Sequence, residues 1–493
     1  MAIPKEILAV ERPRNTNVYA YGKNKDRYGV KMRIGCVRKD GKNRPVNGPT
    51  IGHIVDMRYV PLKKLETAAP DLRDYASVAC CDSLFSDMIA RLDGEYDHSD
   101  SLKIYCIAIL RVCRPGIPDS RLKEAYEESF LSETYPGVAL SKNTVCSFLE
   151  KLGKNLSRIH SFMRKRAAEV GQGHHLLIDG TLKSDESGVN TLSDFSRKAR
   201  TKGSRDISVI YAFDLEKKEP VCSQCYPGNM LDMTAYSDFI EKNGIKSGII
   251  VADKGFPHSQ AAKCFESNPD LHYLNPVRRN SALARNHDMY AYEGILKGHP
   301  EITYKKSKVD GKERWLYSFR DCVRAAKEER DYLSRAVGGF SNSELKAKQE
   351  RFGTVVLESD LDMTAEEIYQ AYSKRWEIET VMRYYKQSCE FDETRVHDDY
   401  SVYATEFINF LSSLLTYRLL NKFEDTGLLE EYTYGEIMQR LRRAKKVRID
   451  EKEGFTLVRL NPSTMNILER LGLVSASPTP EKRKRGRPKK SGV

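Results

Sequence analysis

Two apolar runs in the middle of the chain, at 174–181 and 248–256, each contain an aspartate that a glycine follows directly or one residue later. Such short, almost continuous apolar runs are typical of strands buried within a sheet. Two more strand patterns follow the first run, and helical periodicity surrounds the second. Strands followed by alternating helices predict a mixed sheet covered by helices. The central part of the chain is therefore expected to have an α/β fold.

The two runs predict a carboxylate at the C-terminal edge of each strand. Asp179 and Asp253 end the apolar residues of their runs, and ligands of open α/β sheets bind at this edge. Aspartate and glycine also end strands simply because they form turns. Either run alone therefore has a structural interpretation as well as a functional one.

A helix further along the chain carries four polar residues on one face. A capping-box pattern, T-x-x-E, opens this helix at Thr364. Tyr372, Arg375, Glu379 and Lys386 then fall within an arc of roughly 60°, at about 100° per residue. Arg375 and Glu379 are also an i,i+4 pair of the kind common on solvated helices, so an ordinary surface face is the alternative.

Asp179, Asp253 and Glu379 would together form an anionic oxygen site if the two strands and the helix converge. Such a site suits Mg²⁺ or Mn²⁺. Two ions about 3.5 to 4 Å apart activate a water or a 3′ hydroxyl at a phosphodiester. Arg375 and Lys386 would then hold the neighbouring phosphates.

This series resembles the D-D-E transposases of bacterial insertion sequences, specifically the insertion-sequence-four superfamily with its Y-R-E-K signature. The spacing Tyr372-x2-Arg375-x3-Glu379-x6-Lys386 matches the signature at all four positions. The resemblance extends over residues 170 to 425. It implies a ribonuclease-H-like fold with a β insertion between the second aspartate and the glutamate.

The resemblance also implies an activity: metal-dependent DNA cleavage and strand transfer at the ends of an insertion sequence. It implies that two Mg²⁺ or Mn²⁺ ions are bound by Asp179, Asp253 and Glu379. Tyr372, Arg375 and Lys386 would contact the phosphates of the DNA end. The expected partners are terminal inverted repeats, target DNA and a second copy of the chain in a homodimer. The alternatives are a metal-dependent nuclease without strand transfer and a catalytically inactive protein that binds A·T-rich DNA.

Two other places in the sequence are candidates for DNA contact. Some relatives stack a flipped base on a tryptophan of the insertion, which makes Trp315 a candidate, although a cross-strand aromatic on a hairpin is the alternative. The C-terminal tail resembles an AT-hook, in which Arg485 and Arg487, separated by Gly486 and followed by Pro488, enter a narrow minor groove. Basic tails are also common as generic nucleic-acid or import segments.

The rest of the chain predicts further domains around the core. A turn at Asp40-Gly41 separates strand patterns near the N-terminus, and Val309-Asp310-Gly311 predicts a hairpin in the insertion. The helical region allows a helix-turn-helix ending at 141–152, although plain bundle packing explains the same pattern. We expect a small β module (1–75), a helical region for DNA binding or dimerisation (76–170), the first part of the core (171–268), a β-rich insertion (269–360), the second part of the core with the catalytic helix (361–474) and a basic tail (475–493).

The composition fits a DNA-binding protein of the bacterial cytoplasm. The net charge of +12 favours a polyanionic partner. The 11 cysteines lack the even spacing of a disulfide framework, and Cys222-x2-Cys225 has no second ligand pair at zinc-finger spacing. No basic and apolar leader opens the chain, and no run approaches the roughly 20 apolar residues of a membrane span. We expect a cytoplasmic, nucleoid-associated location.

Overall fold

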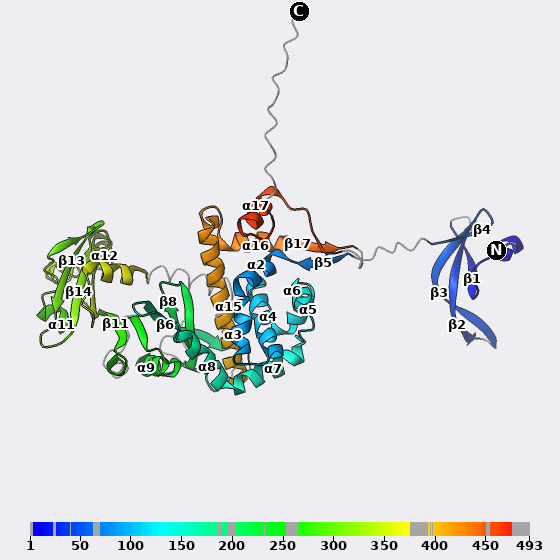
Figure 1. Ribbon diagram of the computed structural model, residues 1–493. Helices are drawn as coiled ribbons and strands as arrows, with labels where there is room; N and C mark the ends of the chain where they lie inside the picture. The colour runs from blue at the N-terminus through cyan, green and yellow to red at the C-terminus, as the bar shows by residue number, and fades with distance from the viewer. Residues whose placement is uncertain are drawn as a thin grey trace, which may run out of the picture. The chain divides into compact units, whose positions relative to one another are not determined.

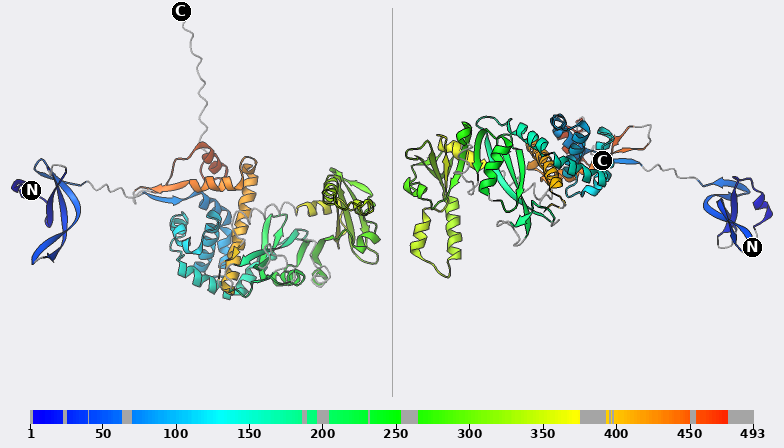
Figure 2. Two further views of the ribbon diagram at one scale, coloured as in Figure 1. Left: turned by 180° about the vertical axis from the view of Figure 1, so that it is seen from behind. Right: turned by 90° about the horizontal axis from the view of Figure 1, so that it is seen from below.

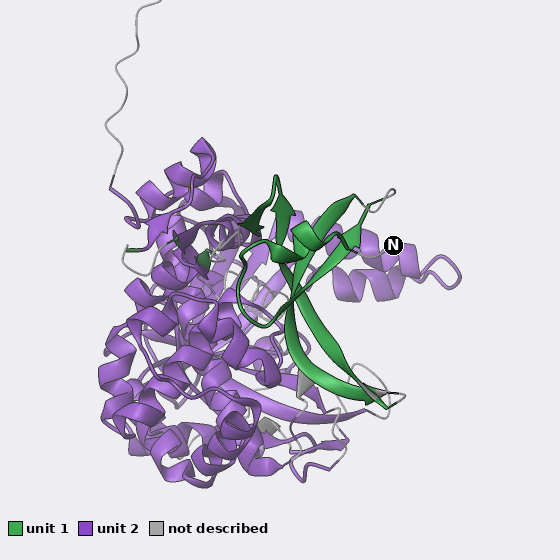
Figure 3. Ribbon diagram, turned by 90° about the vertical axis from the view of Figure 1, so that its right-hand side faces the viewer, with its two compact units in different colours: residues 1–71, 448–454 green, residues 72–447, 455–493 purple. Residues whose placement is uncertain are grey.

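The computed structural model of the protein forms two compact units (Figure 3). Unit 1 contains Met1–Asp71 and Arg448–Gly454, and unit 2 contains Leu72–Val447 and Phe455–Val493. The structure describes residues 3–22, 26–39, 41–62, 70–185, 189–195, 204–230, 232–252, 265–374, 393–394, 396, 398–449 and 454–475.

Unit 1 is a small antiparallel sheet in the order β1-β2-β3-β4. Its elements are α1 (Lys5–Ala9), β1 (Thr16–Tyr21), β2 (Arg27–Lys39), β3 (Lys42–Val55) and β4 (Arg58–Pro61). The predicted turn joins β2 to β3, where Gly41 has φ 71°, a left-handed conformation that favours glycine. Both strands are longer than their sequence patterns, because backbone pairing continues to Lys39 and Lys42.

Unit 2 begins with the predicted helical region. Its helices are α2 (Ala76–Phe85), α3 (Asp87–Asp93), α4 (His98–Cys113), α5 (Leu122–Glu127), α6 (Leu131–Thr134), α7 (Lys142–Lys154) and α8 (Leu156–Ala167). Ser141 caps α7, where its hydroxyl accepts a hydrogen bond from the backbone N–H of Thr144. The helix that precedes α7 is α6, and its four residues are too few for the first helix of a helix-turn-helix.

A long buried helix, α15 (Asp399–Asp425), packs against α4, α7 and β9 (Figure 1). Its approach to α7 is close, since a Cβ on Gly153 would lie 1.7 Å from the carbonyl oxygen of Tyr400. Only glycine fits at this crossing. The chain continues into α16 (Tyr434–Arg443) and α17 (Pro462–Arg470), and a small sheet is formed by β5 (Asp71–Asp74), β17 (Lys445–Arg448) and β18 (Thr456–Leu457).

The predicted mixed sheet lies at the centre of unit 2. Its strands are β6 (His175–Asp185), β8 (Arg205–Asp214), β9 (Glu219–Pro227), β10 (Ser247–Ala252) and β11 (Asp270–Val277), with α9 (Asp232–Asn243) between β9 and β10. β6, β8 and β9 form an antiparallel meander, and β10 pairs parallel to both β6 and β11. The short strands β7 (Asp194–Phe195) and β16 (Glu393–Thr394) pair at its margins. This mixed sheet with flanking helices is the ribonuclease-H-like fold class that the sequence predicts.

The β-rich insertion extends the same sheet. Its elements are α11 (Ala282–Asn286), β12 (Gly294–Leu296), β13 (His299–Lys308), β14 (Trp315–Asp321), α12 (Cys322–Arg335), α13 (Asn342–Gln349) and β15 (Thr354–Ser359). The predicted hairpin is confirmed, with Lys308 opposite Trp315. β15 pairs with β11, so it covers a sheet edge that would otherwise expose unpaired backbone groups.

The insertion also contains a helical projection that the sequence interpretation did not include. α12 and α13 lie side by side (Figure 2), and the Gln349 side chain donates to Glu329 at 3.2 Å. Lys348 lies over the ring of Tyr332 at 4.6 Å.

Among the described residues, no helix is both long and apolar enough to cross a bilayer.

Candidate active site

Asp179 lies on β6 where the parallel pairing with β10 ends. β10 pairs with His175 to Ile178 of β6, and its last residue, Ala252, is opposite Ile178. Asp179 follows directly, paired on its other side with Tyr211 of β8. Its side chain is half-buried, and its Oδ1 accepts the backbone N–H of Gly180 at 2.9 Å. One predicted carboxylate is therefore exposed to solvent in part, at the margin of the parallel sheet.

Asp179 does not lie at the C-terminal edge of its own strand, as the sequence predicted, but only at the end of the part that pairs with β10. β6 continues to Asp185 because β8 pairs with it as far as Ser184. The apolar run ends at Asp179 for another reason: the later residues alternate between the two faces, and buried Thr181 and Lys183 replace aliphatic residues.

Most of the other predicted site residues lie outside the described residues. This applies to Asp253, Arg375, Glu379 and Lys386, and to the tail residues Arg485, Gly486, Arg487 and Pro488. Asp253 is the next residue after Ala252, and Arg375 is the next after Lys374.

The first part of the helix that carries the Y-R-E-K signature packs against β6 and β10. Residues 365–374 are helical, and the capping box is confirmed, since Thr364 and Glu367 exchange backbone-to-side-chain hydrogen bonds. Tyr372 is only 7% exposed and belongs to one hydrophobic cluster with Leu177 of β6 and Val251 of β10. The helix and the two strands therefore share a core.

The last described residue of this helix is anchored to the end of β8. Lys374 Nζ lies 3.1 Å from Oε1 of Glu216, which follows β8 in the chain. Glu216 also accepts the backbone N–H of His175 at 2.7 Å and contacts its Nδ1 at 2.9 Å. Burial alone would raise the pKa of Glu216, but these hydrogen bonds outweigh it and lower the pKa to about 2.

This anchor predicts a stability difference that depends on pH. Glu216→Gln should lower stability at pH 7 by about 1.5 kcal/mol, the usual scale for a hydrogen bond to a charged group. A depressed carboxyl pKa stabilises the fold above the unfolded value of about 4.3 and loses that effect as pH falls toward 2. Calorimetric unfolding between pH 7 and 3 should show the deficit shrinking, whereas a deficit constant with pH contradicts the assignment. Glu424→Gln, in an exposed pair with Lys218, is the matched control.

The same region contains a group of possible metal ligands that differs from the predicted triad. His174, Asp214 and Glu216 have ligand atoms within 4.8 Å of one another. His174 Nδ1 is 2.8 Å from Asp214, and Asp214 also accepts the backbone N–H groups of Glu216 and Lys217. Because each member already has a hydrogen-bond partner, we assign the group a structural role.

Trp315 occupies a cross-strand position on the hairpin, which is the structural alternative to base stacking. It begins β14, opposite Lys308 of β13 and Ser359 of β15. The amine of Lys306 lies 4.8 Å from the centre of its ring, and that of Lys308 lies 5.4 Å away. Two cation–π contacts therefore stabilise the ring on the hairpin.

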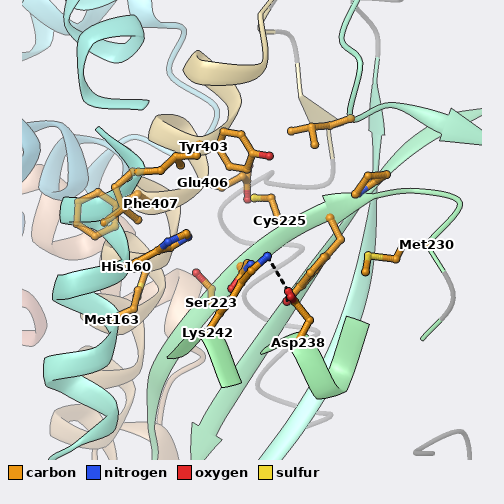
Figure 4. Close-up of a pocket in the computed structure, with 16 residues that line it drawn as sticks. His160, Met163, Ser223, Cys225, Met230, Asp238, Lys242, Tyr403, Glu406 and Phe407 are labelled. Atoms are coloured by element: carbon orange, nitrogen blue, oxygen red, sulfur yellow. Dashed lines mark hydrogen bonds and ion pairs between the residues drawn. The ribbon is translucent and has the colours of Figure 1, made fainter. Parts of the chain in front are cut away.

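A hollow of about 310 Å³ lies between α8, β9, α9 and α15 (Figure 4). Its lining includes Met163, Cys225 and Phe407, together with an ion pair between Lys242 and Asp238 at 3.0 Å. None of the predicted site residues lines it. Burial raises the pKa of the Cys225 thiol, so the cysteine remains neutral in the core.

A buried chain of polar side chains, which the sequence does not predict, is attached to the strand of Asp179. Lys183 of β6 forms an ion pair with Glu406 of α15, and their side chains are 3% and 5% exposed. Glu406 accepts a hydrogen bond from Asn409 at 3.0 Å, and Asn409 accepts one from Arg111 of α4 at 2.8 Å. The only sequence signal is a charged residue within each apolar stretch, which does not reveal the partner.

Comparison with known proteins identifies the domain that contains these elements. The family model of the transposase DDE domain matches residues 171–415. Among solved structures, the cryo-EM structure of a piggyBac transposase synaptic complex with hairpin DNA is similar, with 13% identity, a TM-score of 0.40 and coverage of 75% of this chain and 79% of that chain. No curated protein matches the chain significantly. The matched residues run from β6 into α15 and contain all three predicted catalytic carboxylates, so the chain contains a transposase DDE domain and is a DNA transposase, an enzyme of DNA cleavage and strand transfer.

Proposed function

We propose that Asp179, Asp253 and Glu379 are the catalytic carboxylates of this transposase. The observation that carries the proposal is the parallel pairing of Ile178 with Ala252. The residue after each of these is one of the two aspartates. The helix that leads to Glu379 supports the third assignment, because its first turns share a core with β6 and β10.

The donor set fits a divalent cation. DDE transposases use divalent metals, and we propose two Mg²⁺ or Mn²⁺ ions for this chain. The half-buried carboxylate of Asp179 at a sheet margin offers the hard oxygen ligands that these ions prefer. When bound, they supply charge stabilisation at the reacting phosphate. The three carboxylates hold the ions, and the packed helix and strands fix the spacing between them.

We assign the DNA end to the other signature residues. Arg375 and Lys386 contact phosphates, Arg375 as a planar fork and Lys386 as a point charge. Tyr372 is proposed as the third contact of the Y-R-E-K signature, although at 7% exposure it offers DNA little surface. Its ring also packs between the helix and the sheet. With these assignments, we propose that the chain is a member of the insertion-sequence-four superfamily.

The remaining parts of the chain extend this proposal. Trp315 is a further DNA contact, and Arg485, Gly486, Arg487 and Pro488 form an AT-hook in the basic tail. A homodimer acts on terminal inverted repeats at the nucleoid. We propose the domain order β module, helical region, divided core with insertion, and tail, with the boundaries given by the sequence.

A cleavage assay with a duplex that carries the element's end and Mg²⁺ tests this function. The wild-type protein should nick the end and join it to target DNA, whereas Glu379→Gln should bind DNA and do neither. Glu366→Gln, another glutamate at the start of the same helix, is the matched control. Cleavage by Glu379→Gln contradicts the site assignment. Nicking without joining by the wild type supports the nuclease alternative, and binding alone supports the inactive DNA-binding alternative.

A further inference from the structure

The charged side chains on the sheet of unit 1 are positive. Lysine and arginine recur along β2, β3 and β4, and none of the four strands contains aspartate or glutamate. The described acidic residues of unit 1 lie outside these four strands, at Glu6, Glu11, Asp26, Asp56 and Asp71. A surface with cations and no compensating carboxylates favours a polyanionic partner.

One face of this sheet joins aromatic and polar side chains to a cation. Tyr19 hydrogen bonds to Thr50 at 2.9 Å, and Tyr21 hydrogen bonds to His53 at 3.1 Å. Lys31 lies over the Tyr19 ring at 4.5 Å. These contacts hold the rings in place, so the face is rigid before any partner binds.

The position of the Tyr19 ring requires a glycine opposite it on β2. A Cβ on Gly29 would lie 2.5 Å from the Tyr19 ring. Gly29 therefore allows Tyr19 to lie flat across β2, where it meets Lys31. Asn17 donates to Asn47 next to this pair, which adds amide groups able to hydrogen bond with bases or phosphates.

Beyond this face, β2 and β3 continue alone as a two-stranded ribbon. β1 pairs with β2 no further than Met32, and β4 pairs with β3 only from Gly52 onward. The ribbon therefore comprises residues 33–39 and 42–49, paired from Arg33 and Asn47 to Lys39 and Lys42. Seven residues at about 3.4 Å each give it a length of roughly 24 Å.

Most of the described residues of the ribbon are exposed. Its described cations, Arg33, Arg38 and Arg44, are all exposed, and so are the apolar side chains of Ile34 (64%) and Val37 (55%). Exposed apolar side chains rimmed by polar residues are typical of interaction sites. They are suited to a groove that offers phosphates at its rims and apolar base edges, such as thymine methyl groups, at its floor.

We propose that this ribbon, hereafter the basic ribbon (residues 33–39 and 42–49), enters the major groove of double-stranded DNA. The major groove of B-form DNA, about 12 Å wide, admits a two-stranded ribbon, whereas the deep, narrow major groove of A-form RNA does not. Arg33, Arg38 and Arg44 contact phosphates on either side, and the Tyr19 and Lys31 face lies against the adjoining backbone. The proposal rests on DNA as the transposase's substrate and adds a second DNA contact remote in sequence from the carboxylates.

The test compares two triple variants of the full chain. Arg33→Gln/Arg38→Gln/Arg44→Gln removes the ribbon cations, and Lys123→Gln/Lys154→Gln/Lys218→Gln removes the same charge from exposed lysines paired with carboxylates in unit 2. Binding to a labelled DNA duplex of mixed sequence is measured by fluorescence anisotropy, without divalent metal, across a range of salt. The ribbon variant should show a slope of log affinity against log salt smaller by about 2 to 3, since each lost phosphate contact removes about 0.9. The lysine variant should match the wild type.

Two further measurements make the result decisive. Arg33→Lys/Arg38→Lys/Arg44→Lys should recover most of the salt slope, because lysine also neutralises a phosphate. The ribbon variant should bind an RNA duplex as the wild type does. An unchanged DNA slope, an equal loss in the lysine variant or an equal loss on RNA overturns the proposal. Because binding is measured without metal, failure of the carboxylate assignment appears only in the cleavage assay and leaves this result intact.

Discussion

Asp179→Asn is expected to lower the rate of DNA-end cleavage by about 10³-fold or more, since loss of a metal-ligand carboxylate removes several kcal/mol of transition-state stabilisation. The amide has nearly the same shape, and its oxygen can still accept the Gly180 N–H as Asp179 does at 2.9 Å. Fold and DNA binding should therefore be retained. Single-turnover cleavage of a labelled end, measured over a range of Mg²⁺ or Mn²⁺ concentrations, gives the rate.

The control for this variant is Asp270→Asn, at the start of β11 in the same sheet. Asp270 is an exposed aspartate, and its variant should cleave at the wild-type rate. A fully active Asp179→Asn protein would remove Asp179 from the site. A variant that fails to bind DNA at all would instead show that Asp179 supports the fold, which circular dichroism and the thermal midpoint would reveal.

The sequence predicted those elements of the core whose signals are local. The strands β6, β8, β9 and β10 follow from apolar patterning, and the helix start at Thr364 follows from one capping box. The hairpin at Val309 to Gly311 follows from turn chemistry, and Gly311 has the positive φ of 66° that such a turn requires. Each of these depends on residues close together in the chain.

The features that the sequence did not predict depend on distant partners. The insertion joins the core sheet because β15 pairs with β11 across the intervening hairpin and helices, and periodicity indicates a strand without indicating its neighbour. In the same way, β6 continues to Asp185 although its pattern turns polar after Asp179. Lys183 is buried there because Glu406 neutralises it, and that carboxylate belongs to a helix far along the chain.

The buried pair of Lys183 and Glu406 should therefore give the largest stability effect. Lys183→Met is expected to cost about 3 to 5 kcal/mol, because it leaves the Glu406 carboxylate buried without a counter-charge. The comparable exposed pair, Lys218 with Glu424, has side chains 49% and 59% exposed, and Lys218→Met should cost no more than about 1 kcal/mol. Urea unfolding monitored by circular dichroism measures both.

A double-mutant cycle separates the charge pair from simple packing. Lys183→Met/Glu406→Leu removes both charges and should be more stable than the sum of its single variants predicts, since neither charge is left buried alone. Additive losses would contradict an ion-pair role. Because Lys183 lies on β6 four residues after Asp179 and Glu406 lies on α15, the single variants should also lose cleavage activity at lower temperatures than the wild type does. The double variant should recover part of that range, which would show that the pair fixes the strand of Asp179 against α15.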